Sequence, residues 1–317
     1  MIPSKIKEAL EKQGYRFVGK HSAVKICLWC KKNMRGEGEC YKSKFYGIDS
    51  SRCCQMSSSI EFCHNRCLHC WRPVEYTVGK EIPKKEADRP EEVIRGCIEA
   101  QRKMLLGFKG NPKTPKEKYD LSREPSQFAI SLSGEPTLYP YLGELIELLR
   151  KRGKTSFLVT NGMNPKKLGE LARKKQLPTQ LYLSVNAPNE ELFKKMTRST
   201  VKNGWKVFNK TVRLFPKLKT RKVFRFTVVR GENDKDIEGY AKIVNEGRPD
   251  FVEIKSFMSV GFSRQRLGYD KMPFFEEIRD FSEKLAKLTG LKILDEKEDS
   301  RVVLLGKSKK NMKIKRC

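Results

Sequence analysis

The sequence predicts an α/β protein whose core is a partial (β/α)6 barrel of the TIM-like type. Short apolar runs rich in β-branched residues alternate with longer amphipathic patterns, which is typical of parallel strands joined by helical crossovers. Six such units fit a partial barrel better than an open doubly wound sheet. No G-x-G-x-x-G fingerprint follows any predicted strand, so the sequence does not indicate a dinucleotide-binding sheet.

Each predicted strand is an apolar run bounded by polar or turn-forming residues. The strands cover residues 58–62, 128–132, 156–160, 180–185, 222–229 and 251–254. The predicted helices cover residues 142–152, 165–175, 189–216, 234–245 and 273–289. The first strand leads directly into a cysteine-rich loop.

The chain is predicted to have an extension on each side of this core. Residues 1–57 form an N-terminal extension, residues 58–290 form the barrel, and residues 291–317 form a C-terminal extension with a basic tail. Within the first extension, Ile6, Ala9 and Leu10 predict a short amphipathic helix that packs on the barrel and ends at Gly14.

Composition restricts the class of protein. A chain of 317 residues can bury a large core. It has no apolar run of membrane-spanning length and no signal-peptide pattern, so we expect a cytoplasmic protein without a membrane partner. Ten cysteines in such a chain indicate metal binding or catalysis rather than disulfides.

The excess of positive charge indicates a polyanionic partner. Lys and Arg number 67 against 38 Asp and Glu, giving a net charge of +29. Residues 192–230 contain 13 Lys or Arg and no acidic residue, and further positive charges follow at Lys307, Lys309, Lys310, Lys313, Lys315 and Arg316. We interpret this as an RNA- or DNA-binding surface. The alternative is a solvated basic face, with the interspersed Trp205, Phe208 and Phe215 in the core.

The most informative motif is a cysteine triplet, Cys63-x₃-Cys67-x₂-Cys70. Three thiolates within eight residues can hold three irons of a 4Fe–4S cluster and leave the fourth iron open to another ligand. The spacing resembles the motif of the radical S-adenosylmethionine (SAM) superfamily, in which SAM occupies that iron. Structural zinc is the alternative, with His64 or His69 as a further ligand.

Polar residues follow several of the predicted strands, where barrel enzymes carry their chemistry. The segment after the second strand resembles the "GEP" segment that contacts the amino group of SAM in radical SAM enzymes. Other side chains on or after later strands could bind the ribose, carboxylate and adenine of SAM. The candidates are Ser133, Gly134, Glu135, Pro136, Thr160, Asn161, Ser184, Asn186, Arg225, Thr227, Glu253 and Lys255. Each segment could also be an ordinary turn.

A second cysteine set, formed by Cys27, Cys40 and Cys53, lies upstream of the triplet. Its spacing is not that of a zinc finger, although Cys27 and Cys30 alone would form half of a zinc ribbon. Cys30 and Cys54 lie close by in the sequence. Spacing alone leaves buried cysteines and a zinc site open as interpretations.

Several segments together resemble the archaeal 4-demethylwyosine synthases of the wybutosine pathway, which are radical SAM enzymes. The resemblance covers nearly the whole chain, and the double cysteine set is its most specific part. It is carried by residues 21–25 (HSAVK), 40–42 (CYK), 63–73 with its closing WRP, 261–264 (GFSR) and 300–303 (SRVV).

The resemblance implies a radical SAM barrel, SAM as cofactor and a second 4Fe–4S cluster on Cys27, Cys40 and Cys53. It implies that pyruvate is the co-substrate, loses its carboxyl carbon and binds at this cluster as a Schiff base. A lysine must form this Schiff base, and we assign that function to Lys42, with Lys44 as the second choice. The extra Cys30 and Cys54 depart from the pattern, and either would close the cluster if it were a ligand.

The resemblance also implies the partners. The substrate would be N1-methylguanosine at position 37, in the anticodon arm of tRNA-Phe, and the product the tricyclic 4-demethylwyosine. Electrons would come from a separate donor such as a flavodoxin or ferredoxin, and we expect a monomer. Two competing hypotheses are a zinc-stabilised RNA-binding protein without catalysis and a radical SAM activase of a protein partner.

Overall fold

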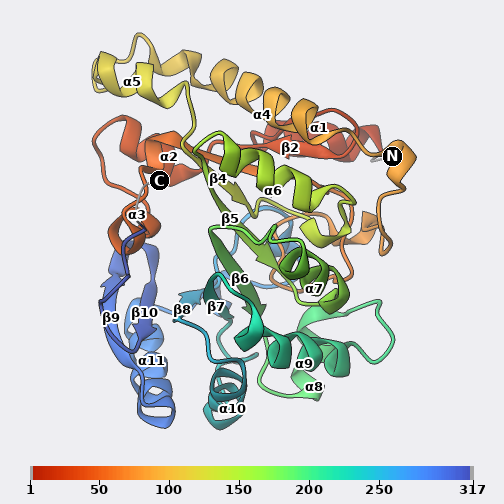
Figure 1. The fold of residues 1–317 in the computed structure, drawn as a ribbon. Coiled ribbons are helices and arrows are strands. Elements are labelled where there is room, and N and C mark those ends of the chain that lie inside the picture. The colour runs from red at the N-terminus through yellow and green to blue at the C-terminus, as the bar shows by residue number, and fades with distance from the viewer. Residues whose placement is uncertain (1–2, 315–317) are drawn as a thin grey trace.

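Six parallel strands form the centre of a ten-stranded sheet in the computed structural model, which describes residues 3–314 (Figure 1). In chain order they are β3 (Cys53–Ser57), β4 (Gln127–Ile130), β5 (Thr155–Thr160), β6 (Gln180–Val185), β7 (Arg221–Val228) and β8 (Phe251–Ser256). Each pairs in parallel with the next, so their carboxyl ends meet at one rim. This arrangement confirms the predicted parallel α/β core and is consistent with a partial barrel.

Antiparallel strands extend this sheet at both edges. β2 (Ser22–Val24) pairs with β3, and β1 (Arg16–Val18) follows it at the outer edge. At the other edge β8 pairs with β10 (Val302–Gly306), which pairs with β9 (Lys292–Lys297). The sequence patterns did not reveal these four strands. Both extensions of the barrel therefore add strands to the same sheet.

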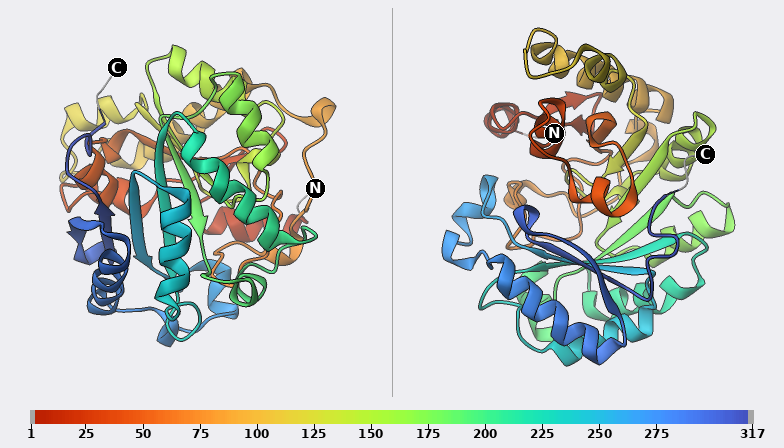
Figure 2. Two further views of the ribbon diagram at one scale, coloured as in Figure 1. Left: turned by 60° about the horizontal axis from the view of Figure 1, so that its bottom comes forward. Right: turned by 90° about the vertical axis from the view of Figure 1, so that its left-hand side faces the viewer.

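Helices cover the outer side of the parallel strands, as the two views of Figure 2 show. They are α4 (Pro90–Leu105), α6 (Leu142–Lys151), α7 (Pro165–Arg173), α8 (Glu190–Thr197), α9 (Gly204–Leu214), α10 (Ile237–Gly247) and α11 (Phe275–Thr289). The shorter α1 (Ser4–Lys12), α2 (Leu28–Met34), α3 (Tyr41–Tyr46) and α5 (Lys116–Ser122) belong to the segments before β3 and before β4. α1 confirms the predicted N-terminal helix, which is followed by Gly14 with a positive φ of 87°.

Two apolar cores lie on opposite faces of the sheet. The larger fills the space between the strands and the outer helices. The smaller lies inside the barrel, where α3 packs against side chains of β5 to β8, with Tyr41, Phe45, Tyr46, Phe157, Tyr182, Val223 and Phe251 among its members. Successive strand residues point to opposite faces, so Phe157 faces the inside and Leu158 the outer helices. The barrel interior is therefore packed with aromatic rings around α3.

The predicted strand at residues 58–62 is wrong. The strand is β3, five residues earlier, and residues 58–62 make only isolated bridges between Ser59 and Gly134 and between Phe62 and Val78. The Ser57 hydroxyl donates to the carbonyl of Ser133 and accepts from the amide of Ser59. Such local side-chain hydrogen bonds compete with a strand ladder and turn the chain away from it.

The helical segment predicted at residues 189–216 is two helices, α8 and α9. Arg198 ends α8 in the left-handed conformation, with φ of 43°. The aromatic side chains of α9 and of the 3₁₀ turn after it belong to the core. Phe208 in α9 and Phe215 in the turn are buried, and Trp205 stacks on Phe208 with ring centroids 5.6 Å apart. The aromatics of the basic stretch are thus packing residues, while Lys202, Lys206 and Lys210 are exposed.

Lys315 and Arg316 of the basic tail lie outside the described residues. Within residues 3–314, no helix has both the length and the apolar character needed to cross a membrane.

One prediction concerns the contact between α10 and β7. A Cβ on Gly247 would lie 2.2 Å from Cζ of the buried Phe224, so Gly247→Ala must displace that ring. We expect the free energy of unfolding to fall by about 1–3 kcal/mol. Gly169→Ala in α7 is the control, since its Cβ would meet nothing closer than Arg173 at 3.8 Å and should add up to about 1 kcal/mol. Urea titrations of both variants measure this, and equal stabilities would contradict the packing described.

Candidate active site

The cysteine triplet lies on the irregular loop that follows β3 at the carboxyl rim of the barrel. Cys63 is buried, and its Sγ accepts a hydrogen bond from the Asn65 amide at 3.4 Å and from Asn161 Nδ2 at 3.6 Å. Arg72 lies beside the thiols. Burial lowers its pKa, but the Cys63, Cys70 and Cys67 sulfurs raise it on balance. The loop therefore brings the three thiols together next to a buried guanidinium.

A cavity of about 240 Å³ opens beside these thiols, and most of the predicted strand-end residues lie around it. Almost every residue proposed for SAM lines it. They are Ser133, Gly134, Glu135, Thr160, Asn161, Ser184, Asn186, Arg225, Thr227 and Lys255, together with Cys63, Cys67 and Cys70. Pro136 is buried behind Glu135, where it begins a 3₁₀ turn, and does not line the cavity.

Glu135 joins the loops after β4 and β5. Its Oε1 accepts hydrogen bonds from the Thr137 hydroxyl and amide and from the Thr160 hydroxyl at 2.7 Å, and its Oε2 accepts from the Asn161 amide at 2.7 Å. The neighbouring Gly134 has φ of 74°, and a Cβ there would lie 1.8 Å from the carbonyl oxygen of Ser59. Glycine is thus required for the backbone to approach the segment that leads to the cysteines.

Unpartnered polar atoms indicate that the cavity takes a polar ligand. Ser133 Oγ, Asn186 Oδ1, Arg225 Nε and His69 Nδ1 are buried and have no hydrogen-bond partner among residues 3–314. Buried polar groups are nearly always satisfied, so a ligand with several donors and acceptors fits here. SAM, with an amino group, a carboxylate and a ribose, is such a ligand.

The structure also brings the second cysteine set together. Cys27 precedes α2 and its Sγ accepts from the Cys30 amide, Cys40 precedes α3, and Cys53 begins β3. Burial raises the pKa of Cys40 to about 11, with a further contribution from Cys27. Burial likewise raises the pKa of Cys53, and both Cys27 and Cys40 add to that effect. The three sulfurs are therefore electrostatic neighbours.

Cys30 and Cys54 have other surroundings. The Cys30 thiol is buried in an apolar cluster and donates to the carbonyl of Ser51 at 3.8 Å, and burial raises its pKa well above the usual value. Cys54 lies in the main core with Cys97. Cys54 faces the outer core. Cys30 is close to the second set, but its thiol hydrogen bond goes to a backbone carbonyl.

Lys42 and Lys44 are separated clearly. Lys44 is exposed and donates to the Glu296 carbonyl at 2.6 Å and to Asp295 Oδ1 at 2.9 Å. Lys42 is buried, and its Nζ lies 4.5 Å from the centroid of the Tyr182 ring and 5.2 Å from that of Phe157. Burial lowers the pKa of Lys42. Of these two lysines, Lys42 is the one whose amine lies inside the barrel beside the second cysteine set.

Glu253 does not have the predicted place in the SAM cavity. This carboxylate on β8 is fully buried and accepts hydrogen bonds from the hydroxyls of Tyr41, at 2.9 Å, and Tyr46, at 2.7 Å. Because these tyrosines stand at the two ends of α3, Glu253 fixes the helix that presents Lys42. Sequence reasoning missed this contact, since 212 and 207 residues separate the partners and no motif marks the pair.

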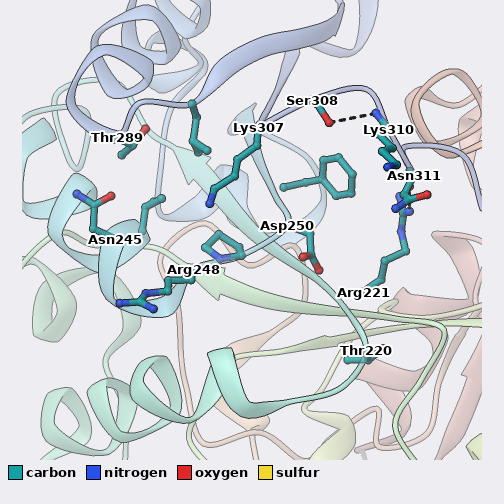
Figure 3. A pocket seen from close by; sticks show the side chains of 14 residues that line it. Thr220, Arg221, Asn245, Arg248, Asp250, Thr289, Lys307, Ser308, Lys310 and Asn311 are labelled. Carbon is teal, nitrogen blue, oxygen red and sulfur yellow. Dashed lines mark hydrogen bonds between the residues drawn. The ribbon is translucent and has the colours of Figure 1, made fainter.

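A larger cavity of about 690 Å³ lies at the amino ends of β7 and β8 (Figure 3). It contains none of the predicted catalytic, metal or SAM residues. Two lysines of the basic tail, Lys307 and Lys310, line it together with Arg248, and Lys307 points into it in Figure 3. The described part of the basic tail therefore begins at the end of the barrel opposite the cysteine triplet.

Comparison with known proteins places the chain in a family. Residues 57–244 match the model of the radical SAM superfamily, and residues 246–307 match a model described as wyosine base formation. The S-adenosyl-L-methionine-dependent tRNA 4-demethylwyosine synthase of Pyrococcus abyssi is 47% identical over 96% of this chain and 89% of its own length. The chain belongs to the tRNA 4-demethylwyosine synthase family of radical SAM proteins.

Further relatives agree with this membership. The Methanocaldococcus jannaschii 4-demethylwyosine synthase is 37% identical over 96% of both chains. A solved structure of TYW1 with a lysine–pyruvate adduct superposes with a TM-score of 0.86 at 36% identity, covering 99% of this chain and 98% of the other. An archaeal TYW1 crystal structure gives a TM-score of 0.81 at 33% identity, with 99% and 100% coverage. The resemblance read from the cysteine motifs is thereby confirmed.

Membership of the 4-demethylwyosine synthase family favours the enzyme over both competing hypotheses. The family is radical SAM, which implies SAM and a 4Fe–4S cluster.

The Glu135 contacts predict a stability effect. In Glu135→Gln one of the two acceptor oxygens becomes an amide nitrogen, which must then face a hydrogen-bond donor of Thr137, Thr160 or Asn161. We expect a loss of about 1–3 kcal/mol in the free energy of unfolding, measured by urea titration under anaerobic conditions. The control Glu117→Gln, at an exposed position of α5, should stay within about 0.5 kcal/mol. No difference between the two variants would show that Glu135 does not join the loops.

Proposed function

We propose that this chain condenses N1-methylguanosine at position 37 of a tRNA with pyruvate to form 4-demethylwyosine. One observation carries the proposal most directly: the Lys42 amine is buried inside the barrel, beside the second cysteine set. Among residues 3–314 this amine has neither a hydrogen bond nor an ion pair, in contrast to Lys44. A relative of high structural similarity has a lysine–pyruvate adduct.

We assign the first cluster to Cys63, Cys67 and Cys70, and SAM to the cavity beside them. When bound, this cluster and SAM supply the radical that takes hydrogen from the N1-methyl group. The chain's own contribution is to hold the ligand in place. Gly134 allows backbone contact with the amino group, while Ser133, Thr160, Asn161, Ser184, Asn186, Thr227 and Lys255 offer hydrogen-bonding groups around the cavity.

The second cluster is assigned to Cys27, Cys40 and Cys53. Cys30 is not assigned as a ligand, because its thiol lies in an apolar cluster and donates a hydrogen bond to the Ser51 carbonyl at 3.8 Å. Cys54 is a core residue on the outer face of β3. Three ligands therefore leave one iron open for pyruvate, as the family resemblance implies.

Lys42 is proposed to bind pyruvate as an imine. Its nitrogen attacks the ketone carbon, a C=N bond forms, and the carbonyl oxygen leaves as water, with no net oxidation or reduction. Attack requires the neutral amine, and burial, which lowers the pKa of Lys42, favours that form. The surrounding rings of Tyr182, Phe157 and Tyr41 exclude water from the amine.

The tRNA is proposed to approach the carboxyl rim. The segment between α8 and α9 lies against the cysteine loop there, because the Thr200 amide donates to the His64 carbonyl at 2.8 Å and Arg198 Nε to the Arg66 carbonyl at 3.0 Å. This contact places the start of the basic stretch next to the proposed cluster. A separate flavodoxin or ferredoxin as electron donor, a monomeric state, a cytoplasmic location and the three-segment division at residues 57 and 290 remain parts of this proposal.

The cluster assignments predict separable losses. Changing Cys63, Cys67 and Cys70 to Ala should abolish reductive cleavage of SAM and leave about half of the iron, because the other cluster has its own ligands. Changing Cys27, Cys40 and Cys53 to Ala should leave some 5′-deoxyadenosine formation and eliminate the tricyclic product. Iron analysis and chromatography of anaerobically reconstituted protein measure both.

Two outcomes would refute these assignments. Normal 5′-deoxyadenosine yield in the Cys63/Cys67/Cys70 variant would remove the first cluster from these residues. Loss of the second cluster's iron in Cys30→Ala would show that Cys30 is a ligand and that no iron is open.

The Lys42 assignment predicts a covalent adduct. Borohydride with labelled pyruvate should trap label on Lys42, located by peptide mass spectrometry. Lys42→Ala should lose both the label and the product while keeping the iron content. Lys44→Ala is the matched control and should keep the label, because that amine is held by Asp295. Label on Lys44 instead would show that Lys44, and not Lys42, forms the imine.

The basic surface predicts a salt-dependent affinity for tRNA. Lys194 and Lys195 already pair with Glu190 and Glu232, so the exposed Lys202, Lys206 and Lys210 are the better test. Reversing these three charges should weaken binding and flatten its dependence on salt, since fewer phosphates are neutralised. The control is reversal of Lys5, Lys7 and Lys12 on α1, with the same change in net charge. Equal effects of the two sets in filter-binding titrations would contradict a localised surface.

A further inference from the structure

Arg225 is a cation inside the barrel without a protein partner. It lies on β7, its Nε is buried without a hydrogen bond, and no ion pair of its guanidinium occurs among residues 3–314. The exposed part of the side chain lines the cavity beside the cysteine triplet. A guanidinium withdrawn from water without an anion is costly, so this position indicates an anionic ligand.

The carboxylate on the neighbouring strand is already engaged. Glu253 stands directly opposite Arg225 in the register of β7 and β8. Both of its oxygens accept hydrogen bonds from tyrosine hydroxyls, Oε2 from Tyr41 and Oε1 from Tyr46. Glu253 thus interacts with Arg225 through its charge but accepts no hydrogen bond from it. The N–H donors of the guanidinium remain available to a ligand.

Arg225 lies between the proposed SAM cavity and Lys42. Thr227 and Lys255 pair with each other nearer the carboxyl rim, and Arg225 lies one inward-facing position deeper, about 6–7 Å along the strand. One further position deeper is the layer of Val223 and Tyr182, and the Lys42 amine lies over the Tyr182 ring.

We propose that Arg225 binds the carboxylate of the 2-oxo acid that Lys42 holds as an imine, and that it makes this site specific for 2-oxo acids. This proposal rests on the proposed function of Lys42. A guanidinium matches a carboxylate through two parallel hydrogen bonds, and it does not compete with Lys42 for the ketone carbon. Arg225 forms no covalent bond, so imine formation still releases only water.

The carboxylate of SAM is the other source of the same chemistry, because Arg225 also lines the cavity proposed for SAM. Asn186, Thr227 and Lys255 lie one layer nearer the rim and remain available to SAM. Lys255 also supplies a cation there, although its amine donates to the Ser300 carbonyl at 2.7 Å.

Borohydride trapping over a range of ketone concentrations tests the proposal. In Arg225→Gln, the pyruvate concentration that labels half of the protein should rise about tenfold or more, the value of a hydrogen-bonded charge pair. The concentration needed for methyl pyruvate, which has no free carboxylate, should change less than twofold. Affinity for SAM, measured by equilibrium dialysis, should also stay within twofold.

Two further variants complete the design. Arg225→Lys keeps the charge, so its half-labelling concentration of pyruvate should lie between those of wild type and Arg225→Gln. This variant tests the proposal if the glutamine variant does not fold. Arg279→Gln removes an exposed arginine of α11 and should behave as wild type.

The outcomes distinguish this inference from the proposed function. Equal trapping of pyruvate by wild type and Arg225→Gln overturns the inference alone. So does a loss of SAM affinity with unchanged trapping, which would assign Arg225 to SAM. Absence of trapping in the wild type overturns the Lys42 imine and the inference with it.

Discussion

The buried carboxylate of Glu253 is the contact on which the interior of this barrel depends. It accepts hydrogen bonds from the hydroxyls of Tyr41 and Tyr46, which lie at opposite ends of the short helix α3. A helix of six residues has little stability of its own, so tertiary contacts must hold it. Once α3 is fixed, Cys40 at its start and Lys42 in its first turn are placed inside the barrel. The position of both therefore follows from one acidic residue on β8.

This constraint also explains why the cations of the interior remain available. The charge of Glu253 acts on both Arg225 and Lys42, but both of its oxygens accept hydrogen bonds from tyrosines. An interior with more positive than negative side chains suits anionic substrates, whose charge compensates what the protein leaves unpaired. Thiolate-bound clusters and the carboxylates of SAM and a 2-oxo acid are such groups. The basic outer surface has a different basis, since its lysines are solvated and act on a polyanion through long-range charge.

Local patterns predicted much of the fold and of the site. The parallel strands, most of the helices between them and the strand-end residues follow from periodicity and from the rule that barrel chemistry lies at the carboxyl rim. The strand at residues 58–62 was wrong because serine hydrogen bonds around Ser57 end the ladder. The edge strands β1, β2, β9 and β10 were missed, since short antiparallel strands lack a strong period. The functions of Glu253 and Arg225 could not be predicted from the sequence. They depend on the hydrogen bonds that the Glu253 carboxylate accepts from side chains far away in the sequence.

In the proposed reaction, one chain joins pyruvate to a tRNA base by radical chemistry. The most direct measurement is mass spectrometry of nucleosides from tRNA carrying N1-methylguanosine, after anaerobic incubation with reconstituted protein, SAM, a reductant and ¹³C-labelled pyruvate. The account predicts a tricyclic nucleoside that carries label from carbons 2 and 3 of pyruvate and none from carbon 1. Recovery of unchanged N1-methylguanosine, with SAM cleaved and pyruvate unconsumed, would contradict it.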